Sequence, residues 1–145
     1  MRCRHPYQCR RARQPDQRVK QGMQLRLFDA IARLFLDPSA ESFLAVFQLV
    51  ATARHAMAIQ RVRDFDVQIR SAQLALDDIA ARAERTGEIA LYQLERKTLR
   101  AAAPHIAAAI EAASPIALTA AQDRVMAELA VHGIAMPTHD TETLA

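Results

Sequence analysis

The feature that most constrains the fold is a run of 48 residues between Pro38 and Gly87 that contains neither proline nor glycine. These two residues interrupt helices most strongly, so their absence favours long helical segments. Apolar residues recur in the second half of the run at alternating spacings of three and four. This heptad stripe consists of Val62, Phe65, Ile69, Ala72, Leu76, Ile79 and Ala83. Because such a stripe needs another helix to cover it, the sequence predicts an all-α protein.

Length and composition limit the number of domains and the kind of fold. The chain has 145 residues, of which 51% are hydrophobic, and this is enough for one compact domain. Only three residues are glycines, which argues against a β fold rich in hairpins, because hairpin turns need residues that tolerate positive φ. We therefore expect a bundle of four or five helices, one of them long.

The long helix is expected to begin near Pro38 and to extend toward Arg85. As one uninterrupted helix it would span roughly 70 Å, more than a compact domain of this size, so it must either protrude or break. We expect the break near residues 61–66, where two aspartates lower the helix propensity. The other helices are expected at residues 24–36, 88–102, 104–113 and 120–132, with breaks at Pro104 and Ser114-Pro115 and an N-cap at Thr119.

Charged pairs four residues apart add support to two of these segments. The expected pairs are Asp29 with Arg33, Asp66 with Arg70, and Asp78 with Arg82.

Basic residues are concentrated at the N-terminus. Residues 1–22 carry seven basic side chains and one acidic side chain, whereas residues 23–145 carry twelve basic and fifteen acidic side chains. The seven basic residues are Arg2, Arg4, Arg10, Arg11, Arg13, Arg18 and Lys20. We expect residues 1–22 to be a disordered basic arm, residues 23–133 a helical domain and residues 134–145 a flexible tail.

Two interpretations of the arm stay open. It is either a solvated leader or a segment that binds a polyanion, such as nucleic acid, anionic lipid or an acidic protein surface. The abrupt change of composition at Met23 also fits a protein that begins at that residue.

The sequence offers no pattern typical of catalysis or of cofactor binding. It has no glycine-rich phosphate loop, no HExxH motif and no serine in the setting of a hydrolase nucleophile. Asp64 and Asp66 diverge on a helix and do not form an acid/base pair. Cys3, His5 and Cys9 lack a fourth zinc ligand, and free thiols fit a reducing cytoplasm. We therefore expect a cytoplasmic, non-enzymatic protein without catalytic residues, cofactor or metal.

No membrane-spanning segment is expected. The most apolar run, Phe43–Val50, has only eight residues and includes Gln48. Extending it toward the length of a span takes in Arg54 and His55, so we interpret the run as a buried part of a helix.

A five-residue motif, Gln24-Leu25-Arg26-Leu27-Phe28, lies where the basic arm meets the first expected helix of the domain. It resembles the short peptide with which bacterial polymerases and repair factors dock on the sliding clamp, except that Arg26 replaces the usual serine or aspartate. The resemblance implies that Leu27 and Phe28 fill an apolar pocket while Gln24 bonds to its rim. The alternative is that Leu27 and Phe28 are core residues, because they share a face with later apolar residues of the same helix.

The heptad stripe also leaves two interpretations open. Either it packs against other helices of the same chain, or it forms the seam of a homodimer. The candidate protein-interaction residues are Val62, Phe65, Ile69, Leu76 and Ile79. Val67 and Leu74 occupy outer heptad positions, and the positions that flank the stripe carry few charges, which favours several neighbours, as in a bundle core.

These observations favour a helical adaptor that assembles with itself or with other proteins. The arginine-rich composition, with lysine only at Lys20 and Lys97, suggests a bacterial genome rich in GC and an accessory factor of a plasmid-transfer or phage system. The alternative is a nucleic-acid-binding or clamp-docking accessory protein that uses the arm and Gln24–Phe28.

Overall fold

The computed structural model describes residues 6–131, with side chains from residue 17 onward, and this range contains five helices and no strand. The helices are α1 (Pro6–Leu36), α2 (Ala40–Gln60), α3 (Asp66–Thr86), α4 (Gln93–Ala112) and α5 (Pro115–Val131). The prediction of an all-α bundle of four or five helices is confirmed.

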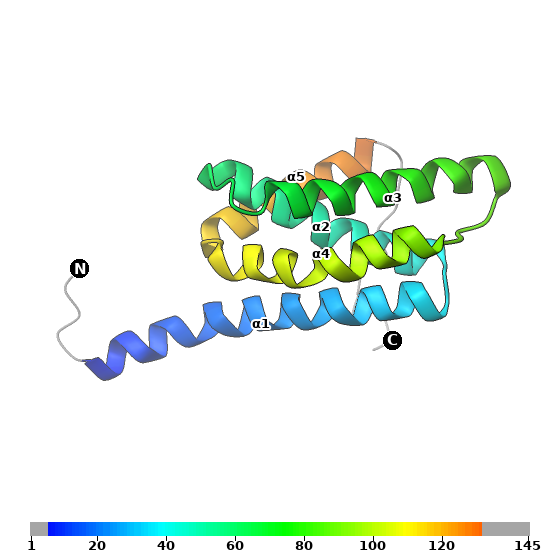
Figure 1. The fold of residues 1–145 in the computed structure, drawn as a ribbon. Coiled ribbons are helices and arrows are strands. Elements are labelled where there is room, and N and C mark those ends of the chain that lie inside the picture. Colours follow the sequence, from blue (N-terminus) through cyan, green and yellow to red (C-terminus); the bar gives the residue numbers. More distant parts are fainter. Residues whose placement is uncertain (1–5, 132–145) are drawn as a thin grey trace, which may run out of the picture.

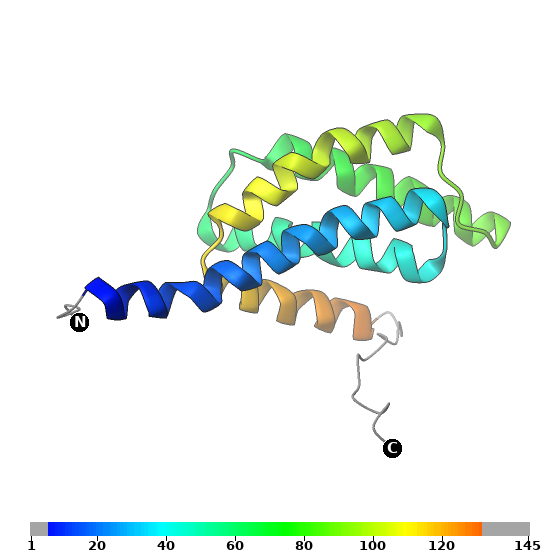
Figure 2. The ribbon, with the colours of Figure 1, turned by 90° about the horizontal axis from the view of Figure 1, so that it is seen from below.

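The central helix of the bundle is α2. It contacts each of the other four helices, and α4 also contacts α1 and α3. In Figure 1, α1 runs along the lower side of the bundle and α3 lies on the upper side. Figure 2 shows α1 and α4 on the face that is seen from below. By length and composition α2 could cross a membrane, but its contacts with four helices account for the apolar composition through core packing.

The core consists of aliphatic side chains and alanines. Its largest fully buried members are Met23, Leu27, Leu34, Met57, Leu76, Ile79, Leu99, Ile106, Ile110, Val46 and Val50. Each buried aliphatic side chain of this size contributes roughly 1.5–3 kcal/mol, so these residues supply the main stabilising term. A smaller cluster of Ala51, Val125 and Leu129 holds α5 on α2.

The expected long helix is broken between α2 and α3, in the region where the sequence predicts a break. Arg61 ends α2 in the left-handed conformation, with φ 56° and ψ 35°. The N–H of Arg61 donates to the carbonyl of Ala58 (3.2 Å), and the N–H of Val62 donates to the carbonyl of Met57 (2.9 Å). These two bonds form a Schellman motif, which ends the helix here without a glycine. The longest helix of the described chain is therefore α1, with 31 residues.

The helix end expected at Pro104 is wrong, because α4 continues through this proline. Pro104 lies on the exposed side of α4, whereas Leu99, Ile106 and Ile110 are buried on the opposite side. The missing backbone hydrogen bond therefore falls on the side where water can replace it. Packing of the buried side holds the helix together across the proline.

The start expected for the last helix is also wrong. α5 begins at Pro115, and its N-cap is Ser114, whose Oγ accepts a hydrogen bond from the N–H of Ala117 (3.1 Å). Proline suits the first helical position, because its missing N–H would have no partner there. Thr119 instead donates its hydroxyl to the carbonyl of Pro115 (3.0 Å) inside the helix.

α1 begins earlier than the expected helix at residues 24–36. Its packing reaches back to Gln17, whose Nε2 donates to Oε1 of Glu111 in α4 (3.2 Å). Lys20 Nζ donates to the carbonyl of Glu111 (3.0 Å). Residues 17–22, assigned to the arm by composition, therefore belong to the packed part of α1. The predictions for residues 1–5, for the side chains of residues 6–16 and for the tail at 134–145 lie outside the described residues.

Candidate functional site

The heptad stripe faces the interior of the bundle. Ile69, Leu76 and Ile79 are buried, and Val62 and Phe65 are half-buried against the same core. α3 packs on α4 and α2, so two helices of the same chain cover the stripe. This packing favours the intramolecular interpretation, because a homodimer seam along these residues would compete with the core.

A groove of about 380 Å³ lies between α2 and α3. Its apolar lining residues are Met57 and Ile69, which are buried in the core, and Leu74, which is exposed. Its charged lining residues are Arg54, Asp66 and Arg70. Arg70 does not pair with Asp66, contrary to expectation, because the ion pairs of the described residues involve neither side chain. The groove thus combines an apolar base with charges of both signs that remain free for a partner.

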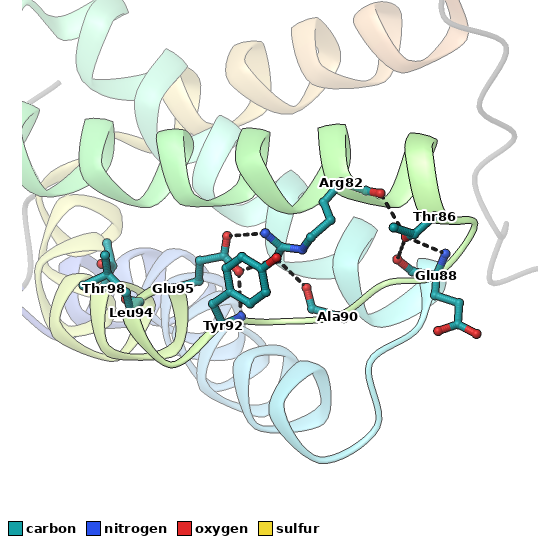
Figure 3. Close-up of polar contacts among 8 residues, drawn as sticks. All are labelled: Arg82, Thr86, Glu88, Ala90, Tyr92, Leu94, Glu95 and Thr98. Carbon is teal, nitrogen blue, oxygen red and sulfur yellow. Dashed lines mark hydrogen bonds and ion pairs between the residues drawn. The ribbon is translucent and has the colours of Figure 1, made fainter.

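The turn between α3 and α4 holds the most buried charged pair of the described chain. Figure 3 shows Arg82 reaching from α3 to Glu95 in the first turn of α4. Arg82 Nη1 donates to Oε2 of Glu95 (3.2 Å), Nη2 donates to Oε1, and Nη2 also donates to the carbonyl of Ala90 (2.7 Å). Glu95 Oε1 accepts the backbone N–H of Tyr92 (2.7 Å), so the same carboxylate caps α4.

Electrostatics and an aromatic contact reinforce this pair. The hydrogen bond to Glu95 raises the pKa of Arg82, against the opposing effect of burial. The guanidinium carbon of Arg82 lies 3.7 Å from the centre of the Tyr92 ring, a cation–π contact. The expected pair of Arg82 with Asp78 is wrong, because Glu95 takes the guanidinium instead. The expected pair of Asp29 with Arg33 is present at 3.0 Å.

The clamp-like motif lies within α1 and is only partly accessible. Leu27 is fully buried in the core, and Gln24 Nε2 donates to the carbonyl of Ala107 in α4 (2.9 Å). Leu25 and Phe28 are exposed. Docking as an extended peptide would require this turn of α1 to leave the bundle and Leu27 to leave the core. The geometry therefore favours the alternative for Leu27, whereas Phe28 is a surface residue.

The basic residues of the N-terminal segment fall into three groups. Arg18 and Lys20 lie in the part of α1 that packs on the bundle, and Arg18 is exposed. Arg10, Arg11 and Arg13 belong to α1, but the structure describes only their backbone. Arg2 and Arg4 lie outside the described residues. Figures 1 and 2 show that the first turns of α1 project beyond the other helices.

A cationic cluster on α4 was not expected from the sequence. Arg96, Lys97 and Arg100 line a hollow of about 460 Å³ together with Gln93 and Leu94, and no acidic residue lines it. The guanidinium carbons of Arg96 and Arg100 lie 5.3 and 5.6 Å from the centre of the Phe35 ring in α1.

The same cluster is anchored to α1 through the backbone. Arg96 Nη1 donates to the carbonyl of Phe35 (2.9 Å), so this arginine is fixed in place. None of the ion pairs of the described residues involves Arg96, Lys97 or Arg100. The sequence signal was the spacing of the three cations, but only the contact with Phe35 shows that they lie at the boundary with α1.

Groups of side chains that could act on a metal or a substrate are sparse. His55 Nε2 lies 3.1 Å from Oε1 of Glu128, which links α2 to α5. Over the described ranges no group of three or more histidine, cysteine or acidic residues is arranged to hold a metal ion.

Comparisons of the chain with protein-family models, with curated proteins and with solved structures find no match.

Proposed function

We propose that the chain is a non-enzymatic, cytoplasmic helical adaptor that binds a helix of a protein partner in the groove between α2 and α3. The observation that carries this proposal is the groove itself, in which the exposed Leu74 and the charged lining residues can reach a partner, whereas Met57 and Ile69 are already covered by the core. Helical partners commonly place apolar residues three or four apart into such a groove. Arg54 and Arg70 on its sides would pair with acidic residues that flank the apolar side of the partner helix.

The exposed apolar residues of α3 extend the groove. Val67 and Leu74 are one heptad apart and both are exposed, so they form a continuous edge beside Arg70. Exposed leucine and valine at this spacing would be covered by a partner that lies along α3. A role in a plasmid-transfer or phage complex is part of the proposal, and it is supported by composition alone.

Site-specific photo-crosslinking in cells tests the adaptor function. With p-benzoylphenylalanine in place of Leu74 we expect a discrete protein adduct after irradiation, whereas the same residue in place of Arg85, exposed near the end of α3, should give none. An adduct with a second copy of the chain would identify the partner as a homo-oligomer, and sedimentation at several concentrations should then show it. No adduct at Leu74, or equal adducts at both positions, would contradict the proposal.

A second candidate function, binding of nucleic acid, is favoured by the projection of α1. The segment that carries Arg10, Arg11 and Arg13 extends beyond the bundle, where a polyanion can approach it from several sides. Each phosphate contact should add about 0.9 to the slope of log affinity against log salt.

Fluorescence anisotropy with a labelled DNA duplex tests this second function. Replacing the three arginines by glutamine should lower the affinity and reduce the salt slope by roughly 2.7 if each contacts one phosphate. The matched control replaces Arg63, Arg85 and Arg124, which are exposed on the bundle, and removes the same charge. Equal losses in the two triple variants would mean that only net charge matters and would exclude a specific role for α1.

A further inference from the structure

The side of the bundle formed by α1 and α4 exposes large apolar residues next to unpaired cations. Leu36 at the end of α1 is 87% exposed, Leu94 at the start of α4 is 73% exposed, and Leu25 in α1 is 70% exposed. Exposed leucines are common singly, but here they occur with the cationic cluster in one region of the surface.

The contacts place these residues on one face. Leu94 lines the same hollow as Arg96, Lys97 and Arg100. Arg96 and Arg100 in turn lie against Phe35, the residue before Leu36. In the other direction along α1, Leu36 shares a stripe with Ala32, Phe28 and Leu25, because their spacings of four, four and three keep them on one side of a helix.

The charge of this face is positive. No acid lines the hollow on α4. Asp29 lies in the same stripe of α1, four residues after Leu25, and is paired with Arg33. Glu111, near the other end of α4, accepts hydrogen bonds from the neutral amides of Gln17 and Gln24 and keeps its charge. Asp37, just beyond α1, and Glu41, in the first turn of α2, are the remaining acids close in sequence to this end. Glu95 is directed to Arg82 on the other side of α4 and does not neutralise the cluster.

We propose that the face of α1 and α4 docks on an anionic bilayer, with Leu25, Phe28, Leu36 and Leu94 entering the interface and Arg96, Lys97 and Arg100 contacting lipid phosphates. Interfacial binding depends on the sum of buried apolar area and attraction to anionic lipid, and this face supplies both. A nucleic acid would use the cations but would gain little from exposed leucines. A polar, acidic protein surface would likewise leave the leucines uncovered.

Such binding needs only the exposed side chains to enter the bilayer. Apolar side chains of peripheral helices enter about 5–10 Å into the boundary between headgroups and acyl chains. α1 runs along this side of the bundle from one end to the other, so its leucines can enter together while the core stays intact (Figures 1 and 2). The groove between α2 and α3 involves neither α1 nor α4, so this inference does not depend on the adaptor function.

Tryptophan fluorescence of the full chain provides the direct test. The protein has no tryptophan, so Leu36→Trp introduces a single reporter. With vesicles of phosphatidylcholine containing roughly 30% phosphatidylglycerol we expect a blue shift and quenching by brominated acyl chains, and no shift with phosphatidylcholine alone. The matched reporter Ile116→Trp lies on α5, where Ile116 is 84% exposed, and should not shift. Absence of a shift at Leu36, or equal shifts at both positions, would overturn the proposal.

Vesicle sedimentation with paired variants separates the two contributions. Each cation near an anionic surface is worth about fivefold in partitioning, so Lys97→Gln with Arg100→Gln should weaken binding by about 25-fold at low salt. Leu25→Ser with Leu36→Ser should weaken it by about tenfold or more. The controls are Arg63→Gln with Arg85→Gln, and Ile116→Ser with Val131→Ser, all exposed in other parts of the bundle. If the leucine pair has no effect, binding is adsorption of charge alone and apolar docking is refuted.

Competition with duplex DNA in the same sedimentation experiment distinguishes binding to a bilayer from binding to nucleic acid. Excess duplex DNA should not remove the dependence of vesicle binding on Leu25 and Leu36, and DNA binding itself should be insensitive to the leucine pair. If the leucine pair weakens DNA binding as much as vesicle binding, the variants act through a change in structure and the proposal fails. Circular dichroism of each variant should show unchanged helix content, because every substituted side chain is exposed or lines the surface hollow.

Discussion

The contact of Arg82 with Glu95 joins the end of α3 to the start of α4, and replacing Glu95 by glutamine should destabilise the bundle measurably. Glutamine keeps the shape and can still accept the N–H of Tyr92, but it removes the negative charge opposite Arg82. The guanidinium would then stay in a site where its side chain is only 11% exposed, without its charge partner. The penalty is the cost of keeping that charge away from water.

The size of this destabilisation depends on how well the neighbouring side chains shield Arg82 from water. Removing one member of a deeply buried ion pair costs about 3–5 kcal/mol. Here the cover includes the Tyr92 ring, and Tyr92 is itself 61% exposed, so Arg82 is close to bulk water. The effective dielectric is therefore higher than in a deep core, and we expect a loss of about 2 kcal/mol in the free energy of unfolding.

Urea unfolding followed by circular dichroism measures this loss. Glu95→Gln should lower the midpoint without changing the slope, since the folded state remains compact. Adding Arg82→Met to Glu95→Gln should cost less than the sum of the two single changes, with a coupling energy above about 1 kcal/mol. A coupling energy below about 0.3 kcal/mol would show that the two side chains contribute only packing and that the charge of Glu95 does not stabilise Arg82.

The raised pKa of Arg82 also determines how its contribution to the stability of the bundle changes with pH. A cation whose pKa is higher in the folded state contributes full stability below the pKa of the unfolded chain, and it loses this contribution only as the pH rises through the still higher pKa of the folded state. The contribution is therefore complete at every pH near neutrality. The loss caused by Arg82→Met should be the same at about pH 6 and pH 9 as far as this group is concerned, and unfolding at both pH values checks it.

Five further substitutions at three places in the bundle have defined expected outcomes, each checked by urea unfolding. Leu76→Ala, at a position with no exposed surface, should cost about 2–5 kcal/mol, whereas Leu74→Gln should change stability by less than about 1 kcal/mol; a large loss at Leu74 would mean that another surface covers it. Arg61→Gly should stabilise by about 0.5–1 kcal/mol, because glycine adopts the left-handed conformation without strain; a loss would indicate that the Arg61 side chain makes stabilising contacts. Ser114→Ala should cost about 1 kcal/mol through loss of the N-cap, with Thr119→Ala as a nearly neutral comparison; equal effects would contradict the assigned cap.

The sequence predicts the class of fold and much of the core because both depend on periodicity. The spacing of Ile69, Leu76 and Ile79 identifies the buried side of α3, and these residues are buried as expected. The break after Gln60 also follows from local signals, although the left-handed Arg61 that produces it could have been any of several residues. Patterns that repeat along one element are therefore recoverable without a structure.

Features that depend on contacts between distant segments are not recoverable in this way. Pro104 is a strong local signal to end a helix, but the packing of buried residues before and after it in α4 overrides that signal. Arg82 has Asp78 at an ideal spacing, yet it pairs with Glu95, because the α3–α4 turn brings a carboxylate that also caps α4. In each case the competing interaction is tertiary, and its strength exceeds the few tenths of a kcal/mol that local pairs supply.

The two surfaces that carry the proposals lie on different parts of the bundle, and this separation constrains how the protein can work. The groove is built from α2 and α3, whereas the face with the exposed leucines is built from α1 and α4. Since α2 packs against both α1 and α3, a rigid core lies between the two surfaces and neither has to open for the other to be used. Binding at one surface should therefore leave the affinity at the other unchanged, and variants of the two surfaces should have additive effects. A protein with two independent surfaces on one rigid core can hold a helical partner at a bilayer without any conformational change, which is the simplest physical form of an adaptor.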